Sequence, residues 1–478
     1  MTTSVGRRRF VPARRASIAL VTAALLASGC AGALAPAGAP AAGVAPPPAM
    51  AGAPPTPPAP ASPAGELQKP IRQVLPNGLR LIVQDHRAAD IVAVYLYVGV
   101  GVRYEKPNEL GSAHFQEHML FKGTDKWGAG YIDRAVEGVG GRTNATTSFD
   151  YTDFYIVVPA DALEVAVQTL ADMAFRSTFD PKEVDRERQV ILEEANIQID
   201  NPRTAIVRDI YSLVFADNPY GYPPLGTPET LSAATGAKLK AFNQHYYTPE
   251  NMTVVVVGPV EPQKVRALVD RIFGAIPATG YKAGPAPAPP PLRGVSRRTV
   301  QRPEQQAFLA MGWQAPRADD ANGDAVDLLT TILAGSESSR LVRRLRDDER
   351  LVNGVSMSYS AQMGGGIASL RAELEAKDIA QVERIVLEEI AKMQESGPTE
   401  EERQLAVTKF EAQHAFDTET SEGLANAYGL AETTWTLDAE LGYVDRLRKI
   451  TREQIRDAAR RYLSRTDYAQ VGFVPKKP

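Results

Sequence analysis

Cysteine is almost absent from this chain: Cys30 is the only one among 478 residues. A single thiol excludes an intrachain disulfide framework and a zinc site built from several thiolates. Histidine is scarce too, with five in the chain. A metal site must therefore use imidazole and carboxylate ligands. His114 and His118, which lie four residues apart, are the first candidates.

An excess of positive charge is also lacking. The chain has 53 basic and 57 acidic residues, for a net charge of -4. A broad nucleic-acid footprint needs a basic excess, so we expect no nucleic-acid partner. Apolar residues make up 44% of the chain, which is ordinary for a globular protein. A length of 478 residues exceeds what one compact core usually holds, so we expect two or more domains.

Residues 1–30 have the layout of an export signal. Arginines between residues 7 and 15 precede a short apolar stretch, residues 16–26, which is typical of a signal peptide. Small residues then lead to Cys30 and resemble a bacterial lipobox, although Ala27 stands where that pattern prefers leucine. We expect a lipidated Cys30 that anchors the protein to a cell-envelope membrane. The alternative is secretion into the periplasm or the medium after cleavage nearby.

Two segments rich in proline divide the rest of the chain. Residues 31–65 are nearly all Ala, Pro and Gly, a composition that cannot bury a core and that predicts an extended tether. Residues 283–295 predict a second linker of the same kind. The sequence therefore predicts one domain at residues 66–282 and another at residues 296–478.

The same order of elements is predicted in both domains. In the first, we expect paired strands at 79–83 and 91–98, a helix at 111–122, strands at 144–148 and 153–158, helices at 160–175 and 181–199, and a strand at 253–257. In the second, we expect strands at 308–313, 357–361 and 367–374, helices at 320–334 and 378–395, and a closing helix end, loop and strand at 462–474. Residues 246–253 align with 462–469 without a gap. We predict an α+β fold of two homologous halves, each a mainly antiparallel sheet packed with helices.

The segment His-Phe-Gln-Glu-His at residues 114–118 is the strongest functional signal. On a helix, positions four apart lie on one face, so His114 and His118 point the same way. Zinc suits two imidazoles and one carboxylate, with a fourth position left for water. Glu117 lies beside the pair, where it can take a proton from a metal-bound water and return it to a leaving amine.

A third ligand is expected on the helix that begins at Pro181. Glu187 and Glu194 are seven residues apart, so they lie on nearly the same face of that helix. Spacing alone does not choose between Glu193 and Glu194 as the ligand.

Three segments of the chain resemble the pitrilysin/insulinase family of zinc metallopeptidases, which includes the mitochondrial processing peptidase. Residues 111–124 read Gly-x-x-His-Phe-x-Glu-His-Met-x-Phe-Lys-Gly-Thr, residues 140–148 read Gly-Gly-x-x-Asn-Ala-x-Thr-Ser, and residues 187–194 read Glu-Arg-x-Val-Ile-x-Glu-Glu. The resemblance extends from residue 75 to about residue 475 and is specific mainly in the first half. It implies that each such chain forms half of a clamshell-shaped chamber.

The resemblance also implies roles for individual residues. Glu194, which follows His118 by 76 positions, matches the third zinc ligand. Glu187 matches a residue that lies near the site behind the zinc ligands and does not bind the metal itself. Asn144 and Ala145 match the edge strand that pairs with an extended peptide substrate through backbone hydrogen bonds.

One motif of the family is incomplete. The family has an arginine followed seven residues later by a tyrosine, and the two bind the substrate backbone and the tetrahedral intermediate. Arg346 matches the arginine, but Asn353 stands at the tyrosine position. We therefore expect a homo- or heterodimer in which a related subunit supplies the Arg/Tyr pair.

Three functions account for these observations to different degrees. A zinc endopeptidase acting on peptides or unfolded polypeptides accounts for His114, Glu117, His118 and Glu194 together. The alternative is a non-catalytic binding or assembly subunit of the same fold. A metal-binding protein without hydrolase activity would leave Glu117 unexplained.

Overall fold

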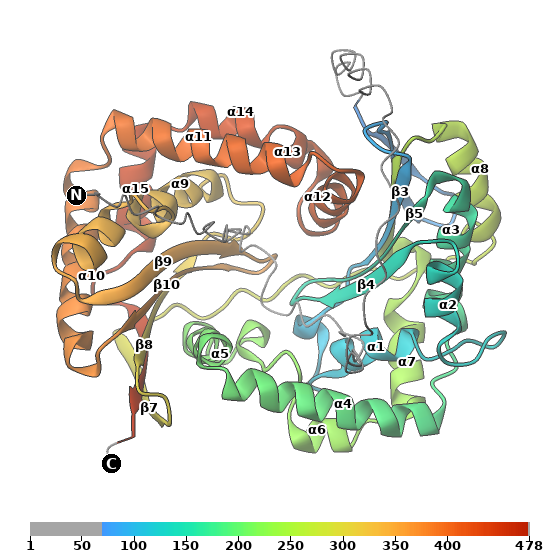
Figure 1. Ribbon diagram of the computed structural model, residues 1–478, viewed down its shortest axis with the longest axis horizontal. Coiled ribbons are helices and arrows are strands. Elements are labelled where there is room, and N and C mark those ends of the chain that lie inside the picture. The colour runs from blue at the N-terminus through green and yellow to red at the C-terminus, as the bar shows by residue number, and fades with distance from the viewer. Residues whose placement is uncertain (1–68, 477–478) are drawn as a thin grey trace, which may run out of the picture.

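The computed structural model describes residues 69–476, which form two β-sheets covered by helices (Figure 1). The first sheet has six strands in the order β1-β2-β6-β3-β5-β4. Its strands are β1 (Ile71–Val74), β2 (Arg80–Asp85), β3 (Ile91–Val98), β4 (Arg142–Thr147), β5 (Thr152–Pro159) and β6 (Met252–Gly258). The signal peptide, Cys30 and the tether predicted before residue 66 lie outside the described residues.

The second sheet has five strands in the order β7-β11-β8-β10-β9. They are β7 (Val295–Arg302), β8 (Ala307–Ala315), β9 (Val352–Ala361), β10 (Gly366–Leu374) and β11 (Tyr468–Pro475). The strands β2 and β6 pair in parallel, as do β7 and β11, and the other pairs are antiparallel. Apart from β1, the two sheets therefore repeat one topology, and the predicted α+β fold of two homologous halves is confirmed.

The helices of the first half lie between residues 112 and 272. They are α1 (Ser112–Leu120), α2 (Tyr131–Glu137), α3 (Leu163–Arg176), α4 (Pro181–Asp200), α5 (Pro202–Val214), α6 (Pro228–Ser232), α7 (Gly236–Tyr246) and α8 (Pro262–Ile272). The start of α4 follows the sequence directly: Pro181 occupies its first turn, and the side chain of Asp180 accepts a hydrogen bond from the Lys182 N–H at 2.8 Å.

The helices of the second half lie between residues 323 and 462. They are α9 (Gly323–Ala334), α10 (Ile379–Ser396), α11 (Glu400–Asp417), α12 (Ser421–Thr434), α13 (Leu437–Leu441), α14 (Tyr443–Lys449) and α15 (Arg452–Tyr462). A π-helical segment, η5 (Val342–Asp348), precedes β9. Helix α7 ends at Tyr246 and β6 begins at Met252, whereas α15 ends at Tyr462 and β11 begins at Tyr468. Since both intervals are equal, the gapless alignment of 246–253 with 462–469 is confirmed.

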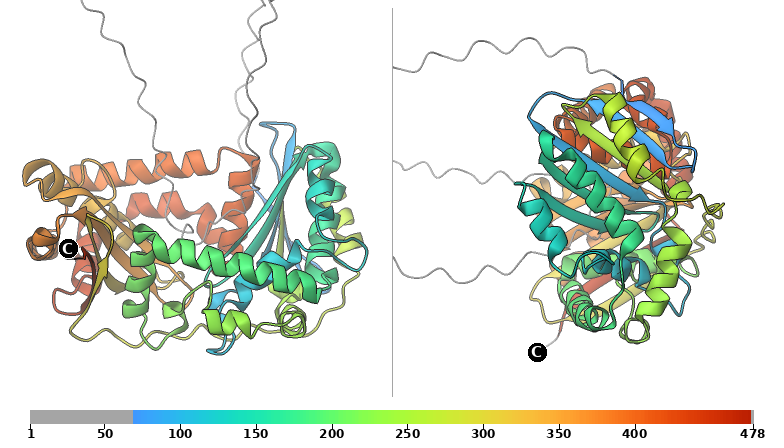
Figure 2. Two further views of the ribbon diagram at one scale, coloured as in Figure 1. Left: turned by 60° about the horizontal axis from the view of Figure 1, so that its bottom comes forward. Right: turned by 90° about the vertical axis from the view of Figure 1, so that its right-hand side faces the viewer.

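Each half lends a helix to the sheet of the other half. Helix α5 packs on β8 and β11 of the second sheet, and α12 packs on β3 and β6 of the first (Figure 1). Side chains from both halves consequently share two apolar clusters, one around α5 and one around α12. The long helix α4 runs across the molecule from the first half toward the second (Figure 2).

The predicted pairing of residues 79–83 with residues 91–98 is wrong. The two strands β2 and β3 do not touch, because β6 lies between them and bonds to both. All seven residues of β6 are buried, and its run of four valines suits a strand with neighbours on either side. Helix α8 follows this strand and packs on β2 and α3.

Candidate metal centre

Helix α1 carries the His-Phe-Gln-Glu-His segment and begins at an unusual cap. Its N-cap residue, Gly111, has a φ of 87°, and a Cβ there would lie 2.7 Å from the Leu225 carbonyl oxygen. Gly111 offers no side chain to the free N–H groups of the first turn, and Glu105 satisfies them instead. The carboxylate of Glu105 accepts hydrogen bonds from the Gly111 N–H at 2.8 Å and the Ala113 N–H at 2.7 Å.

The histidines of α1 and one glutamate of α4 converge. His114 Nε2 lies 3.7 Å from Glu194 Oε2, and His118 Nε2 lies 3.5 Å from the same oxygen. Both histidines are buried, at 2% and 5% exposure. These three side chains form a cluster, in which each offers a ligand atom within 4.8 Å of the others. Residues 69–476 hold no second such group of His, Cys, Asp or Glu.

This donor set fits a tetrahedral zinc ion. Ligand atoms at 2.0–2.2 Å from a tetrahedral ion lie roughly 3.3 to 3.6 Å apart, close to the separations found between the histidine nitrogens and the glutamate oxygen. Glu193, the alternative that the sequence left open, is exposed and does not belong to the group of three. The structure therefore brings together His114, His118 and Glu194, and leaves Glu193 outside.

Glu187 orients one of the histidines. Its Oε2 lies 3.0 Å from His118 Nδ1, and its Oε1 lies 2.9 Å from Lys122 Nζ. Burial alone would lower the pKa of His118, but hydrogen bonds to Glu187 and Glu194 raise it to about 9. Because Glu187 occupies Nδ1, the Nε2 atom of His118 is directed at the cluster, as in the carboxylate–histidine pairs of metal sites. Burial lowers the pKa of His114 to about 3, which favours the neutral imidazole that a metal needs. Metal binding would displace the proton that Glu187 and Glu194 favour on His118.

Glu117 is buried next to the cluster and touches the edge of the first sheet. Thr147, at the end of β4, donates a hydrogen bond from its hydroxyl to Glu117 Oε2 at 2.6 Å. Burial raises the pKa of Glu117 to about 7, against the opposing effects of the Thr147 hydrogen bond and His118. A carboxyl group with a pKa near neutrality can both accept and return a proton at physiological pH.

The predicted substrate strand is an edge strand. Asn144 and Ala145 lie in β4, which bonds only to β5 within the first sheet. The other edge of β4 is therefore open to a further strand. Since Thr147 of the same strand contacts Glu117, a peptide added along β4 would run past the cluster.

Arg346 does not join the cluster. It lies in η5 of the second half, where Asp347 binds its Nε at 2.8 Å and Glu337 pairs with its Nη1. The position seven residues later, Asn353, is exposed in β9. The contacts of Arg346 are thus with carboxylates of its own half.

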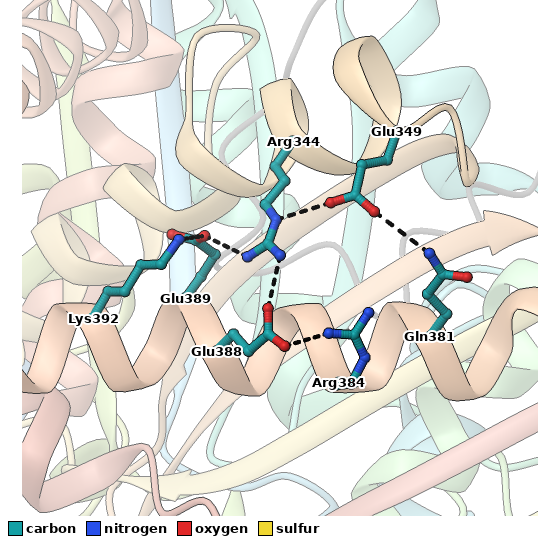
Figure 3. Close-up of polar contacts among 7 residues, drawn as sticks. All are labelled: Arg344, Glu349, Gln381, Arg384, Glu388, Glu389 and Lys392. Carbon is teal, nitrogen blue, oxygen red and sulfur yellow. Dashed lines mark hydrogen bonds and ion pairs between the residues drawn. The ribbon is translucent and has the colours of Figure 1, made fainter.

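A neighbouring arginine holds η5 in place. Arg344 binds Glu388 and Glu389 of α10, each at 2.7 Å, and Glu349 at 3.0 Å (Figure 3). This network fastens η5, which also carries Arg346, to α10.

Three residues of the site were not assigned a role from the sequence. Thr147 lies in the motif at residues 140–148 and Lys122 in the motif at residues 111–124. Their place in these motifs was the sequence signal that pointed to the site. Glu105 stands outside every motif, and no local pattern marks it as the cap of α1.

Two family models match the chain. The model for insulinase, peptidase family M16, matches residues 80–228, and the model for the peptidase M16 inactive domain matches residues 233–410. The first match contains all the residues of the cluster, and the second lies beyond it.

The chain is also similar to bacterial proteins named as proteases. It is 31% identical over 414 residues to an uncharacterized zinc protease of Mycobacterium bovis, covering 86% of this chain and 94% of that one. It is 31% identical over 332 residues to the uncharacterized zinc protease YmxG of Bacillus subtilis, covering 69% and 80%. The crystal structure of a protease from Helicobacter pylori shares the fold, with a TM-score of 0.81 at 24% identity, covering 86% of this chain and all of that one.

Proposed function

The chain belongs to the insulinase family, peptidase family M16, and we propose that it is a zinc-dependent endopeptidase acting on peptides or unfolded polypeptides. Zinc is its cofactor, as in the relatives named zinc proteases. The convergence of His114, His118 and Glu194 on one point is the observation that carries the proposal.

These three residues would hold the ion. When bound, zinc would supply Lewis acidity, which lowers the pKa of water and polarises the scissile carbonyl group. The residues of the chain supply the rest. Glu187 holds His118 in orientation through the 3.0 Å contact at Nδ1.

Glu117 would act as the general base and then as the general acid. Its carboxylate takes a proton from the attacking water and returns it to the nitrogen of the leaving amine. The hydrogen bond from Thr147 fixes one carboxylate oxygen, which leaves the other for the proton transfer. The pKa of about 7 suits a group that must exist in both forms during a cycle.

The open edge of β4 supports an endopeptidase rather than an enzyme that trims chain ends. Backbone hydrogen bonds to Asn144 and Ala145 would hold an extended peptide regardless of its sequence. Such binding needs no free terminus, which supports the proposal that the enzyme cleaves within a chain.

The test is the hydrolysis of a quenched fluorescent peptide library by the chain without residues 1–65, compared with its Glu117→Gln variant. We expect the wild type to cleave and a chelator to stop it, because metal removal takes away the Lewis acid. Glu117→Gln should lose activity by at least about 100-fold while it retains zinc, because the base is removed and the ligands are not. Cleavage by Glu117→Gln at the wild-type rate would contradict the role of Glu117.

The other candidate is a non-catalytic binding or assembly subunit. If wild type and Glu117→Gln both bind one zinc ion per chain and neither cleaves, the result would favour the non-catalytic subunit or would point to a missing partner. A second subunit is proposed in either case, either another copy of this chain or a related chain. Only a related chain of different sequence would supply the complete Arg/Tyr pair, because a second copy also carries Asn353. The carboxylates around Arg346 and the asparagine at 353 support this proposal.

We also propose export through residues 1–30 and attachment to a cell-envelope membrane through lipidated Cys30. Within residues 69–476, no helix has the length and apolar character needed to cross a bilayer. Replacing Cys30 with Ser should move the protein from the membrane fraction to the soluble fraction. An unchanged distribution would argue against lipidation. The division into domains at residues 66–282 and 296–478 likewise stands as a proposal.

A further inference from the structure

A cavity of about 120 Å³ lies between the two halves. Its wall begins at Ala195, the residue that follows Glu194 in α4, and continues through α5 and the loop at residues 222–226. The opposite wall is formed by β9 and β10 of the second sheet. Helix α4 therefore contributes both to the cluster, through Glu194, and to the wall of this cavity.

The lining of this cavity is cationic. It includes Arg203, Arg208 and Arg371 and no aspartate or glutamate. Arg203 and Arg208 pair with carboxylates that do not line the cavity. Arg203 Nε lies 2.6 Å from Glu373, and Arg208 Nη2 lies 3.0 Å from Asp209.

Arg371 differs from the other two arginines. It projects from β10 and is half-buried, and no carboxylate among residues 69–476 pairs with it. Burial lowers the pKa of its guanidinium, and the neighbouring Tyr211 opposes this effect only in part. Partial burial of a cation without a counterion is costly, and an anionic ligand would offset that cost.

Hydroxyl groups lie beside Arg371 on the same wall. Ser369 is two positions away on β10, so it faces the same side of the sheet, and Ser358 of β9 is its partner in register. Ser358, Ser360 and Ser369 all line the cavity. A guanidinium with adjacent hydroxyl donors is the chemistry that recognises a carboxylate.

We propose that Arg371 binds a carboxylate of the peptide substrate, an inference that rests on the peptidase function proposed above. The carboxylate belongs to an Asp or Glu side chain or to a free C-terminus, and it makes the enzyme prefer acidic peptides.

The experiment uses nine-residue quenched peptides that carry Glu or Gln at one position in turn, each with a free or an amidated C-terminus. The ratio of kcat/KM for the Glu peptide over the Gln peptide is measured for wild type, Arg371→Gln and Arg371→Lys. Arg317→Gln is the matched control, because Arg317 is a surface arginine that pairs with Asp319. We expect wild type to prefer Glu at one position, or the free acid over the amide, by about tenfold or more.

Arg371→Gln should bring that ratio close to one, Arg371→Lys should keep part of it, and Arg317→Gln should keep all of it. A preference for Glu inside the peptide identifies a side-chain carboxylate, and a preference for the free acid identifies the C-terminus. Efficient cleavage with equal ratios in wild type and Arg371→Gln would overturn the proposal.

A binding measurement separates this proposal from the catalytic one. Fluorescence anisotropy gives the affinities of labelled Glu and Gln peptides, free or amidated, for the Glu117→Gln chain, with and without Arg371→Gln. A carboxylate preference that Arg371→Gln removes would support the cavity's role even if wild type cleaves nothing. Affinities that do not depend on the carboxylate or on Arg371 would overturn it.

Discussion

Glu193 and Glu194 are adjacent in the sequence, but only Glu194 lies with the histidines of α1. A helix turns by about 100° per residue, so neighbouring side chains cannot both face the same partner. Glu194 consequently approaches His114 and His118, while Glu193 is exposed to solvent. At the scale of the residue, one step along the helix separates a metal ligand from a surface charge.

This difference predicts the zinc content of two variants. Loss of a residue that hydrogen-bonds to a metal ligand weakens metal binding by roughly 10- to 100-fold. Glu194→Gln should weaken zinc binding by more than this, because a charged ligand is replaced by a neutral amide. Glu193→Gln is the matched control and should bind zinc like wild type. The measurement is zinc stoichiometry after dialysis against a competing chelator. Loss of zinc from Glu193→Gln but not from Glu194→Gln would show that the neighbouring carboxylate is the ligand.

Helix α1 depends on a residue that lies outside it. Its N-terminal N–H groups are bound by the buried carboxylate of Glu105, because the glycine at its N-cap has no side chain to offer. Burial raises the pKa of Glu105, whereas the two backbone hydrogen bonds lower it and favour the carboxylate. At the scale of the element, the helix that carries both histidines is thus positioned by Glu105.

Replacing Glu105 with Gln should therefore destabilise the protein and loosen the metal centre. The amide keeps one acceptor but turns a donor toward an N–H group, which costs about 1–3 kcal/mol of unfolding free energy. Denaturant titration and zinc competition measure the two effects. Glu109→Gln is the control, since the nearest cation to its side chain, Lys106, is 3.9 Å away. Equal stability and zinc affinity in both variants would show that the cap does not position α1.

The two halves hold each other together through exchanged helices. Where α12 crosses the first sheet, Gly429 lies against Tyr97, and a Cβ at position 429 would lie 2.3 Å from two ring carbons. Tyr97 is buried and donates a hydrogen bond to the side chain of Asn426, also in α12, at 2.6 Å. At the scale of the molecule, this close approach joins the second half to the sheet that carries the β4 edge.

Gly429→Ala should accordingly separate α12 from the first sheet. We expect a loss of about 1–3 kcal/mol in unfolding free energy, because a well-packed contact is overfilled. Gly354→Ala is the control: a Cβ there meets nothing within 4 Å, and a change within about 0.5 kcal/mol is expected. Equal denaturation midpoints for the two variants would show that α12 tolerates the extra methyl group.

Much of the fold could be predicted from the sequence because its signals are local. The Asp180-Pro181 cap marked the start of α4, the apolar run at 91–98 matched β3, and equal intervals at 246–253 and 462–469 showed the repeat. The order of strands could not be predicted in this way. Strand β6 enters between β2 and β3 from far along the chain, and no local pattern states which neighbours a buried strand will have.

By itself, the sequence determined the type of chemistry. The chain has two histidines at helical spacing, a glutamate between them and a single cysteine. Imidazole and carboxylate groups are therefore the available metal ligands. Tertiary structure alone decided what surrounds them. It placed Glu194 rather than Glu193 at the cluster, capped α1 with Glu105, and set Arg371 without a carboxylate partner beside α4. The physical reason is that bonding geometry fixes spacing along one helix, whereas contacts between helices and sheets depend on how distant segments pack.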